Sequence, residues 1–269
     1  LAHNTWVLPR KASKKNLLYY FFCYKLPNFF YQNRWGILPV NFPELVTIQL
    51  KNSFNQILRR KEYNYIFINY ASWATLIENN ANLGKATTVL DTHDFLTAQN
   101  QKKYPIGASF QEEIRRLSLF DKVLAISIEE QYLFSQFCKT DINLAPMMIK
   151  KPTASTIPIV ERPFDLIYIA SKNPHNITAA KWFIEQVYPR LPGSIKICII
   201  GQITEFITDK YPNIILIPFA DKLDKYYHQA KIAICPMLSG TGTKIKVIEA
   251  LSYHLPVVCN TRGGGGVVN

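Results

Sequence analysis

The sequence lacks the features that mark several classes of protein. No hydrophobic run approaches the roughly 20 residues that a membrane-spanning helix needs, and no secretory signal peptide is visible. The five cysteines form no C-x-x-C pair and lie mostly in apolar, strand-like runs; they are Cys23, Cys138, Cys198, Cys235 and Cys259. They are therefore expected to be buried thiols in a reducing compartment. These absences favour a cytoplasmic protein that is soluble or bound peripherally to a membrane.

Recognisable metal ligands and paired catalytic carboxylates are also missing. The sequence contains no D-x-D pair and no cluster of histidines and cysteines with ligand spacing, so neither a metal ion nor another cofactor is expected. Glu112 and Glu113 are adjacent on an expected helix and would point about 100° apart, which is poor geometry for the acid/base pair of a glycosidase. A surface role is expected for at least one of them.

Acidic residues are scarce at the start of the chain. The net charge is +12, and residues 1–62 hold ten Lys and Arg against two Glu, a local balance of 10 − 2 = +8. Within this region, residues 10–35 interleave basic residues with aromatic ones. Such a stretch could be a core helix with a solvated basic flank, could lie on an anionic membrane surface, or could bind nucleic acid. No RNP-like, helix-turn-helix or zinc-finger signature accompanies it, so no nucleic-acid partner is expected.

The second half of the chain alternates short β-branched runs with helical patterns. The expected strands are 163–171, 194–201, 213–219, 231–237 and 256–260, and the expected helices are 176–191, 223–230 and 243–254. Unbroken apolar strands of this kind are typical of a parallel sheet that is covered on both faces. The second half is therefore predicted to be a doubly wound α/β domain.

The first half of the chain is less regular but also indicates an α/β unit. Strands are expected at 63–71, 86–94 and 122–127, and a helix at 109–120. The segment 147–163 contains prolines and small polar residues without periodicity, which is typical of a linker. With 269 residues the chain is long enough for two domains, and we expect them at 1–150 and 151–269.

The stretch from Ser239 to Val258, SGTGTKIKVIEALSYHLPVV, carries the clearest chemical signal. Its Gly/Thr turn lets backbone N–H groups approach an anion, and the helix behind the turn adds about half a positive charge. Lys244 and Lys246 would supply mobile cations, and Glu249 could accept hydrogen bonds from the hydroxyls of a ribose. The pattern favours a nucleotide-diphosphate site, although turns and amphipathic helices of this kind occur throughout α/β proteins.

Ligands of doubly wound sheets bind outside the carboxyl ends of the strands. Asn173, His175 and Asn176 follow the first strand of the second half, at the start of a helix. They either cap the free N–H groups of that helix or contact a phosphate or sugar.

Together these features resemble the GT-B glycosyltransferases, specifically the large retaining family (glycosyl transferases group 1) whose donors are nucleotide sugars. In the first half the resemblance rests on DTHD (91–94), on Glu112 and Glu113, and on FDKVLAIS (120–127) with Glu130. In the second half it rests on residues 217–263. The resemblance implies two Rossmann-like, doubly wound domains that face each other across a cleft, both incomplete.

The resemblance also implies roles for individual residues. Glu249 would hold the ribose hydroxyls, Lys244 would face the diphosphate, and the loop 217–219 would meet the base. His93 would lie near the reacting sugar, unless it is a structural residue at a strand end. His93, Lys244 and Glu249 are therefore the expected catalytic residues. The residues expected to bind the donor are Asn173, His175, Phe219, Ser239, Gly240, Thr241, Gly242, Thr243, Lys244 and Glu249.

The sequence departs from the family pattern in several places. Thr241 stands where many relatives have a second glutamate, and SKNPHNI (171–177) stands where relatives commonly have an Arg and a Lys. His254 occupies a position where Gly usually ends the helix in a left-handed conformation. The first strand of the N-terminal domain and the terminal helices are missing, so a fragment truncated at both ends is expected. The glycines at 263–266 are expected to form a flexible loop.

The function implied by the resemblance is that of a hexosyltransferase-like enzyme. It would move a sugar from a nucleotide-diphosphate donor to a glycan or lipid-linked acceptor in polysaccharide biosynthesis, with retention and without metal. It would work in the cytoplasm, with peripheral contact to the inner face of the cell membrane through residues 10–35. The alternatives are a nucleotide-sugar epimerase of the same fold and a noncatalytic module that binds nucleotide sugars or glycans.

Overall fold

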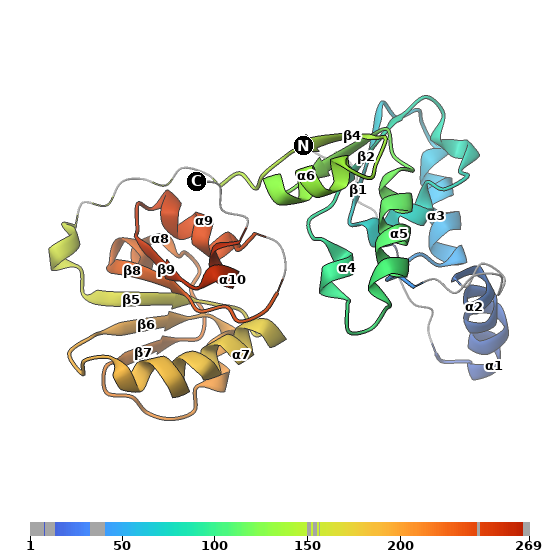
Figure 1. Cartoon of the computed structure of the whole chain (residues 1–269). Helices are drawn as coiled ribbons and strands as arrows, with labels where there is room; N and C mark the ends of the chain where they lie inside the picture. Colours follow the sequence, from blue (N-terminus) through green and yellow to red (C-terminus); the bar gives the residue numbers. More distant parts are fainter. Residues whose placement is uncertain are drawn as a thin grey trace. The chain divides into compact units, whose positions relative to one another are not determined.

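The computed structural model describes residues 8, 14–32, 41–149, 152, 155, 157–240 and 243–265. The chain divides into two compact units, Leu1–Ala145 and Pro146–Asn269. Each unit contains one parallel β-sheet with helices packed against it (Figure 1). The division lies a few residues before the boundary expected after residue 150.

The sheet of unit 1 has the strand order β1-β2-β3-β4, and every neighbouring pair is parallel. Its strands are β1 (Tyr65–Asn69), β2 (Thr87–Asp91), β3 (Lys122–Ala125) and β4 (Asp141–Leu144). The first three confirm the strands predicted in this half of the chain. Strand β4 was not predicted, because its DINL sequence is short and places polar residues among the apolar ones.

Several helices of unit 1 were not anticipated either. The helices are α1 (Leu17–Tyr19), the π-helical η1 (Tyr20–Lys25), α2 (Leu26–Gln32), α3 (Ile48–Leu58), the 3₁₀ turns η3 (Ala71–Leu76) and η4 (Ala81–Leu83), α4 (Leu96–Gln99), α5 (Ile106–Leu117) and α6 (Ile128–Ser135). Of these, α5 confirms the helix predicted at 109–120. Side-chain caps fix two other starts: Thr47 accepts from the Leu50 N–H before α3, and Ser127 accepts from the Glu130 N–H before α6.

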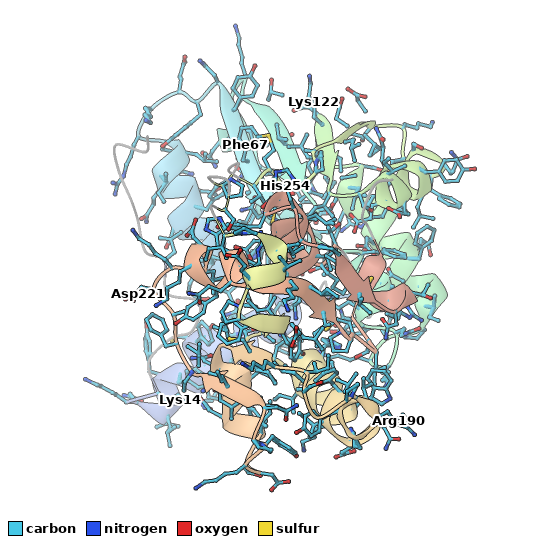
Figure 2. The ribbon with its side chains drawn as sticks, turned by 90° about the vertical axis from the view of Figure 1, so that its left-hand side faces the viewer. Lys14, Phe67, Lys122, Arg190, Asp221 and His254 are labelled. Carbon is cyan, nitrogen blue, oxygen red and sulfur yellow. The ribbon has the colours of Figure 1, made fainter. Side chains whose placement is uncertain are left out.

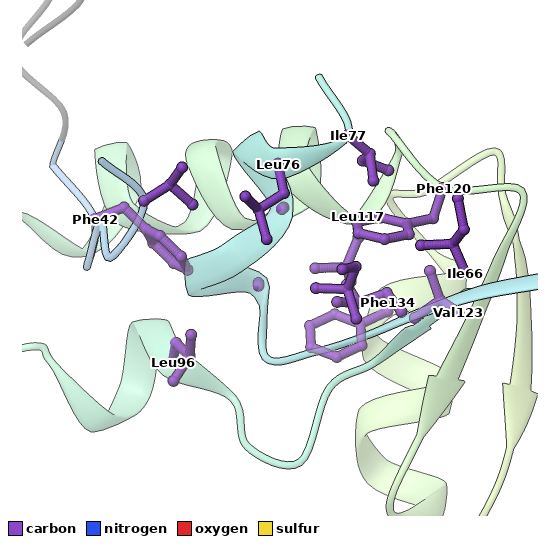
Figure 3. Packing of buried hydrophobic residues seen from close by; sticks show 14 of the residues in the cluster. Phe42, Ile66, Leu76, Ile77, Leu96, Leu117, Phe120, Val123 and Phe134 are labelled. Atoms are coloured by element: carbon purple, nitrogen blue, oxygen red, sulfur yellow. The ribbon is translucent and has the colours of Figure 1, made fainter. Parts of the chain in front are cut away.

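The core of unit 1 lies between the sheet and these helices. Leu117 at the end of α5 packs among Phe120, Val123 and Phe134, as Figure 3 shows. Strand β1 alternates, so that its Ile side chains enter this core while Phe67, labelled in Figure 2, is exposed. The alternation fixes which side of β1 faces the helices.

A buried ion-pair network fastens α5 to the segment that precedes α3. The Arg116 side chain is fully buried, and its guanidinium donates to Glu112 Oε1 at 2.9 Å, to Glu44 Oε2 at 2.8 Å and to the Ala71 carbonyl at 3.1 Å. It also lies 4.8 Å from the centre of the Phe42 ring. Two carboxylates and a carbonyl therefore satisfy a cation that would otherwise be very costly to bury.

The expected surface role for Glu112 or Glu113 is wrong. The Glu113 carboxylate is buried and accepts hydrogen bonds from the Leu96 and Thr97 N–H groups at 2.9 and 2.8 Å. It therefore caps the first N–H groups of α4. Burial raises the pKa of Glu113. Burial also acts to raise the pKa of Glu112, but the neighbouring arginines outweigh it and lower that pKa to about 2. Both residues are structural.

The sheet of unit 2 has the strand order β7-β6-β5-β8-β9 and is parallel throughout. Its strands are β5 (Phe164–Ile169), β6 (Ile197–Ile200), β7 (Ile214–Ile217), β8 (Ala230–Cys235) and β9 (Val257–Cys259). The helices are η5 (Ile159–Glu161), α7 (Pro174–Trp182), the π-helical η6 (Phe183–Val187), η7 (Tyr188–Arg190), η8 (Gln202–Phe206), α8 (Asp224–His228), α9 (Ile245–Ser252) and α10 (Thr261–Gly264). Every strand and helix predicted for this half of the chain is confirmed.

Side chains of unit 2 alternate between two cores, one on each face of the sheet. On β5, Tyr168 packs with Phe183 at the α7 face, whereas Ile167 packs with Tyr227 of α8 and Ala250 of α9 on the other face. Because successive residues of a strand point to opposite faces, this division shows that helices cover both faces. Unit 2 is therefore doubly wound, as predicted.

An apolar hollow of about 430 Å³ opens on the α7 face of this sheet. Trp182 and Phe183 form one wall, and Leu166, Ile234 and Val258 from β5, β8 and β9 form another. Val258 is 59% exposed. The hollow therefore lies beside the end of α7, against β5, β8 and β9.

The cysteines only partly follow their predicted burial. Cys198 and Cys235 are buried and Cys138 is partly buried, but Cys23 and Cys259 are exposed. Burial raises the pKa of the Cys198 thiol to about 11. The prediction of uniformly buried thiols is therefore wrong for Cys23 and Cys259.

The glycines after β9 are more ordered than the sequence suggested. Thr261–Gly264 form a helical turn whose Gly263 N–H donates to the Asn260 side chain at 2.9 Å. A Cβ added at Gly263 would lie only 2.4 Å from the Cys235 carbonyl oxygen. The expected flexible loop is thus a packed turn as far as Gly264.

No helix in the described part of the chain is both long and apolar enough to cross a bilayer.

We predict that Arg116→Ala lowers the free energy of unfolding by about 3 to 5 kcal/mol, because the carboxylates of Glu44 and Glu112 would remain without their buried cation. Hydrogen exchange across a urea series, read on peptides of α5, measures the change. Lys172→Ala is the control, since its ion pair with Glu205 is half exposed and should be worth less than about 1 kcal/mol. Equal effects of the two substitutions would contradict the importance of the buried network.

Candidate functional site

The loops at the carboxyl ends of β5 and β8 meet in unit 2. His175 Nδ1, at the start of α7, lies 2.8 Å from Ser239 Oγ in the loop after β8. Gly240 follows with φ +102°, and its Cα faces the His175 ring. Of the turn predicted to bind the diphosphate, Ser239, Gly240 and Thr243 are therefore near the edge expected for a ligand. Thr241 and Gly242 lie outside the described residues.

Asn173 and Asn176 secure the start of α7. The Asn173 side chain accepts from the Asn176 N–H at 2.8 Å, so its capping role is confirmed. The Asn176 side chain is buried; its Nδ2 donates to the Ser171 carbonyl at 3.0 Å, and its Oδ1 accepts from Lys246 Nζ at 2.8 Å. Asn176 is thus a structural link between α7 and α9.

The two lysines of the motif, Lys244 and Lys246, have different roles. Lys244 occupies the N-cap position of α9, whose free N–H groups lie at the carboxyl edge of the sheet. Lys246 is turned inward: besides its bond to Asn176, its ammonium lies 5.3 Å from the centre of the Tyr168 ring. Burial lowers the pKa of Lys246. The expectation that both lysines are mobile cations is therefore wrong for Lys246.

Glu249 is held in place by an aromatic pair that the sequence analysis did not identify. Its Oε2 accepts a hydrogen bond from the Tyr227 hydroxyl at 3.0 Å. The Tyr227 ring is buried and stacks on Tyr253 with 4.5 Å between ring centres. Burial is the main cause that raises the pKa of Tyr227, with the Glu249 charge adding to it, so Tyr227 keeps its proton and remains a donor. The carboxylate is consequently fixed in orientation rather than free to rotate.

Two further features complete the carboxyl edge of this sheet. Phe219 follows β7 and is 77% exposed. Its ring is therefore accessible to a planar ring of a ligand. Gly201 follows β6 with φ +107°, and a Cβ there would lie 2.3 Å from the Ala170 carbonyl oxygen. Only glycine allows the loops after β5 and β6 to approach this closely. The sequence indicates Gly201 only as a glycine at a strand end.

The predicted catalytic histidine, His93, belongs to unit 1 and lies in the turn after β2. Its Nε2 is 3.3 Å from Asp91 Oδ2, and its ring stacks on Tyr70 with 4.8 Å between centres. Both Tyr70 and His93 have positive φ, at +66° and +57°. Side chains other than glycine hold such conformations at a cost of about 1 to 3 kcal/mol, and these residues concentrate at functional sites. Tyr70 was missed, because no sequence pattern marks a backbone strain.

A buried carboxylate lies behind this turn. Thr92 Oγ1 donates to Glu130 Oε2 at 2.9 Å, and Glu130 lies in the first turn of α6. Burial raises the pKa of Glu130 to about 7, and the nearby Asp94 and Glu113 charges add to the effect while the Thr92 hydrogen bond opposes it. Glu130 therefore changes its protonation near neutral pH, next to the residues that hold His93.

No group of three or more His, Cys, Asp or Glu side chains that could hold a metal ion occurs among the described residues.

The chemistry available to unit 2 follows from these positions. The start of α9 and Lys244 provide positive potential at the carboxyl edge, where an anion such as a diphosphate can bind. Glu249 provides an oriented acceptor for hydroxyl groups, and Phe219 an exposed aromatic face. An anion, a hydroxylated ring and a planar ring are the three parts of a nucleotide.

Residues 163–269 match the family described as Glycosyl transferases group 1. The chain is also similar to a Klebsiella pneumoniae protein described as an uncharacterized 44.6 kDa protein in the cps region. The two are 21% identical over 89% of this chain and 69% of that protein.

Solved structures with a similar fold include sucrose-phosphate synthase from Thermosynechococcus elongatus, with a TM-score of 0.61 at 15% identity over 80% of this chain and 60% of that one. Anabaena HepE in complex with UDP gives a TM-score of 0.62 at 14% identity over 80% of this chain and 64% of that one. The chain thus spans less than two thirds of these structures. At such identities the likeness concerns the fold, and it confirms the prediction of two Rossmann-like α/β domains of the GT-B class.

We predict that Glu130→Gln flattens the pH dependence of stability. In the wild-type chain the folded-state pKa of about 7 exceeds the ordinary value of 4.5, so the free energy of unfolding falls as pH rises between these values. The total loss should be on the order of 3 kcal/mol, and it should level off above the folded-state pKa.

Urea denaturation between about pH 5 and pH 8 measures this slope. Glutamine can still accept the Thr92 hydrogen bond but carries no titrating proton. Glu129→Gln, one residue earlier and exposed, is the matched control and should leave the slope unchanged. A slope that persists in Glu130→Gln would mean that another group causes it.

Proposed function

We propose that this chain transfers a sugar from a nucleotide-diphosphate donor to an acceptor hydroxyl, a proposal that the match of residues 163–269 to the Glycosyl transferases group 1 family supports. The observation that carries the proposal is the pairing of Glu249, oriented by Tyr227, with the start of α9 at the carboxyl edge of the sheet. In the reaction the bond between the sugar and the diphosphate breaks, and the diphosphate leaves with the electron pair. The acceptor oxygen forms the new bond to the anomeric carbon, and its proton passes to an oxygen of the departing diphosphate.

Glu249 is proposed to accept hydrogen bonds from the ribose hydroxyls of the donor. The Tyr227 hydrogen bond occupies Oε2 and fixes the plane of the carboxylate, so that a hydroxyl pair meets an acceptor that is already oriented. Phe219 is proposed to contact the base, since its ring is exposed at the end of β7. These contacts select the nucleoside part of the donor.

The diphosphate is proposed to bind at the turn that leads into α9. The helix N-terminus and Lys244 would stabilise the negative charge that develops on the leaving group, which is electrostatic catalysis without a need for metal. Backbone N–H groups from residues 239–243 and the side chain of His175 would add contacts, with Thr241 and Gly242 assigned from the sequence alone.

His93 is proposed to act on the acceptor side, near the reacting sugar. Its stacking on Tyr70 and its contact with Asp91 fix the ring, as a group that stabilises developing charge requires. The finer parts of the proposal are retention at the anomeric carbon and a glycan or lipid-linked acceptor. They also include a cytoplasmic location with peripheral contact to the cell membrane. A role in polysaccharide biosynthesis is in keeping with the description of the Klebsiella relative as a protein in a cps region.

We predict that one nucleoside diphosphate binds the purified chain saturably, and that Glu249→Ala weakens this binding by about tenfold or more, as expected for hydrogen bonds to a charged group. Calorimetric titration with UDP, GDP, ADP and CMP, first with a chelator and then with magnesium, makes the measurement. Lys244→Ala should also weaken binding. Tyr227→Phe should have a smaller effect, because the carboxylate remains.

Lys231→Ala is the control for charge, since Lys231 pairs with Asp165 near the opposite ends of the strands. It should leave the affinity unchanged. Equal losses in Lys231→Ala and Lys244→Ala would argue for nonspecific attraction. Binding that requires magnesium would overturn the metal-free form of the proposal.

We predict that His93→Ala leaves nucleotide affinity within about twofold but lowers the rate of sugar transfer by roughly a hundredfold, as removal of an electrostatic catalytic group does. Release of nucleoside diphosphate from the donor, with and without glycan acceptors, measures the rate, and NMR of the product gives its anomeric configuration. Product formed only by change of configuration of the donor sugar would favour an epimerase. Binding without any turnover in the wild-type chain would favour a noncatalytic module.

A further inference from the structure

The helical segment formed by α1, η1 and α2, residues 17–32, exposes an unusual amount of apolar surface. Leu17 and Leu18 are 70% and 73% exposed, and Phe22 and Phe29 are 59% and 58% exposed. In this whole segment only Tyr24 and Asn28 are buried. The possibility that residues 10–35 form a core helix is therefore wrong for the part that the structure describes.

The side of this segment that faces the protein is polar. Asn28 Nδ2 donates to Gln49 Oε1 at 2.7 Å, and Asn28 Oδ1 accepts from the Ile48 N–H at 2.7 Å. Gln32 Nε2 donates to the Val46 carbonyl at 2.9 Å, and Gln49 Nε2 donates to the Cys23 carbonyl at 3.0 Å. The segment is thus tied to the start of α3 by hydrogen bonds, as its place beside α3 in Figure 1 also shows.

This arrangement reverses the usual pattern of a surface helix in water. Such a helix normally buries its apolar stripe and turns its polar residues to the solvent. Here the amide side chains are directed to the protein and the Leu and Phe side chains to the outside. A contiguous exposed apolar face of this kind marks a surface that contacts another apolar medium.

The charged side chains of the segment itself are all basic. Lys14, labelled in Figure 2, and Lys15 are exposed just before α1, and Lys25 is exposed within η1. The ammonium groups of Lys14 and Lys25 lie 5.7 and 5.9 Å from the ring centres of Tyr20 and Phe21, so each lysine stem runs along an aromatic ring. The sequence has no Asp or Glu before Glu44. The surface is therefore complementary to a negatively charged one.

We propose that the segment of residues 14–32 docks unit 1 on an anionic lipid bilayer. The helix lies in the plane of the interface, with Leu17, Leu18, Phe22 and Phe29 about 5 to 10 Å deep at the boundary of headgroups and acyl chains. The lysines remain among the lipid phosphates. The hydrogen bonds of Asn28 and Gln32 hold the segment rigidly on α3, so the bilayer fixes the position of unit 1.

A bilayer fits this surface better than a protein partner does. A protein interface surrounds its apolar centre with a polar rim, whereas a bilayer supplies a continuous layer of phosphates above a continuous apolar layer. Lysines that flank Leu and Phe at the level of the headgroups match that layering. The inference rests on the peripheral membrane contact named in the proposed function and assigns it to one segment and one class of lipid. Its test is independent of the donor site.

The test is flotation of the full chain with vesicles of phosphatidylcholine alone or mixed with phosphatidylglycerol. We expect binding to the mixed vesicles that decreases with added salt, and little binding to the neutral ones. Leu18→Ser/Phe22→Ser should weaken binding by at least about tenfold, since apolar area no longer leaves water. Lys14→Gln/Lys25→Gln should weaken it roughly fivefold per lysine.

Matched controls separate this face from other exposed apolar residues. Val258→Ser changes the apolar hollow of unit 2, and Tyr132→Ser changes a 70% exposed aromatic residue of α6. Neither should affect vesicle binding. Because all these side chains are exposed, the variants should keep the thermal midpoint of the wild type, which circular dichroism checks.

Two results would overturn the proposal. One is vesicle binding that is equal in Leu18→Ser/Phe22→Ser and the wild type. The other is self-association of the wild-type chain in sedimentation experiments without lipid that the same double substitution abolishes, which would make the face an interface between copies of the chain. Catalytic activity on a soluble acceptor, if present, should be unchanged in either variant, so this test is independent of the proposed reaction.

Discussion

The hydrogen bond between Lys246 and Asn176 holds the carboxyl edge of unit 2 together. It joins α9 to the first turn of α7, and Asn176 in turn binds the loop after β5 through Ser171. Burial of an ammonium group is costly unless other groups interact with its charge. Here the Asn176 amide oxygen accepts a hydrogen bond from the Lys246 ammonium, which also lies over the Tyr168 ring. The start of α9, Lys244 and Glu249 all depend on the position of that helix. Lys246, predicted from the sequence to be a mobile cation for a ligand, thus holds the elements of the site in place.

The regular elements of unit 2 could be predicted because each obeys a simple rule of burial. Strands such as β6, ICII, are apolar throughout since both of their faces are covered. The prediction of a left-handed residue at His254 is confirmed by its φ of +59°, because a helix end imposes that conformation whatever residue occupies it. The family resemblance then gave the residues of the donor side, and their roles remain proposals.

The features that could not be predicted concern the direction in which particular side chains point, which composition does not determine. Nothing in the sequence tells that Lys246 turns inward while Lys244 stays at the edge, since the choice follows from the phase of α9 against the sheet. A surface role was expected for at least one of Glu112 and Glu113 because carboxylates are usually exposed, but two backbone N–H groups at the start of α4 donate to the buried Glu113 carboxylate. The segment of residues 17–32 has the composition of a core helix, and only the structure shows that its amide side chains face the protein.

The ion pair between Arg116 and Glu44 has a consequence for how unit 1 assembles. Its two residues are 72 positions apart, so the interior of unit 1 closes only after a long stretch of chain has been brought back onto the segment before α3. Contacts of such sequence separation slow folding, because the entropy of loop closure is lost before any contact compensates it. During synthesis the aromatic segment of residues 17–32 leaves the ribosome well before α5 does. This apolar segment is therefore synthesised before α5, and it is still exposed when unit 1 has folded.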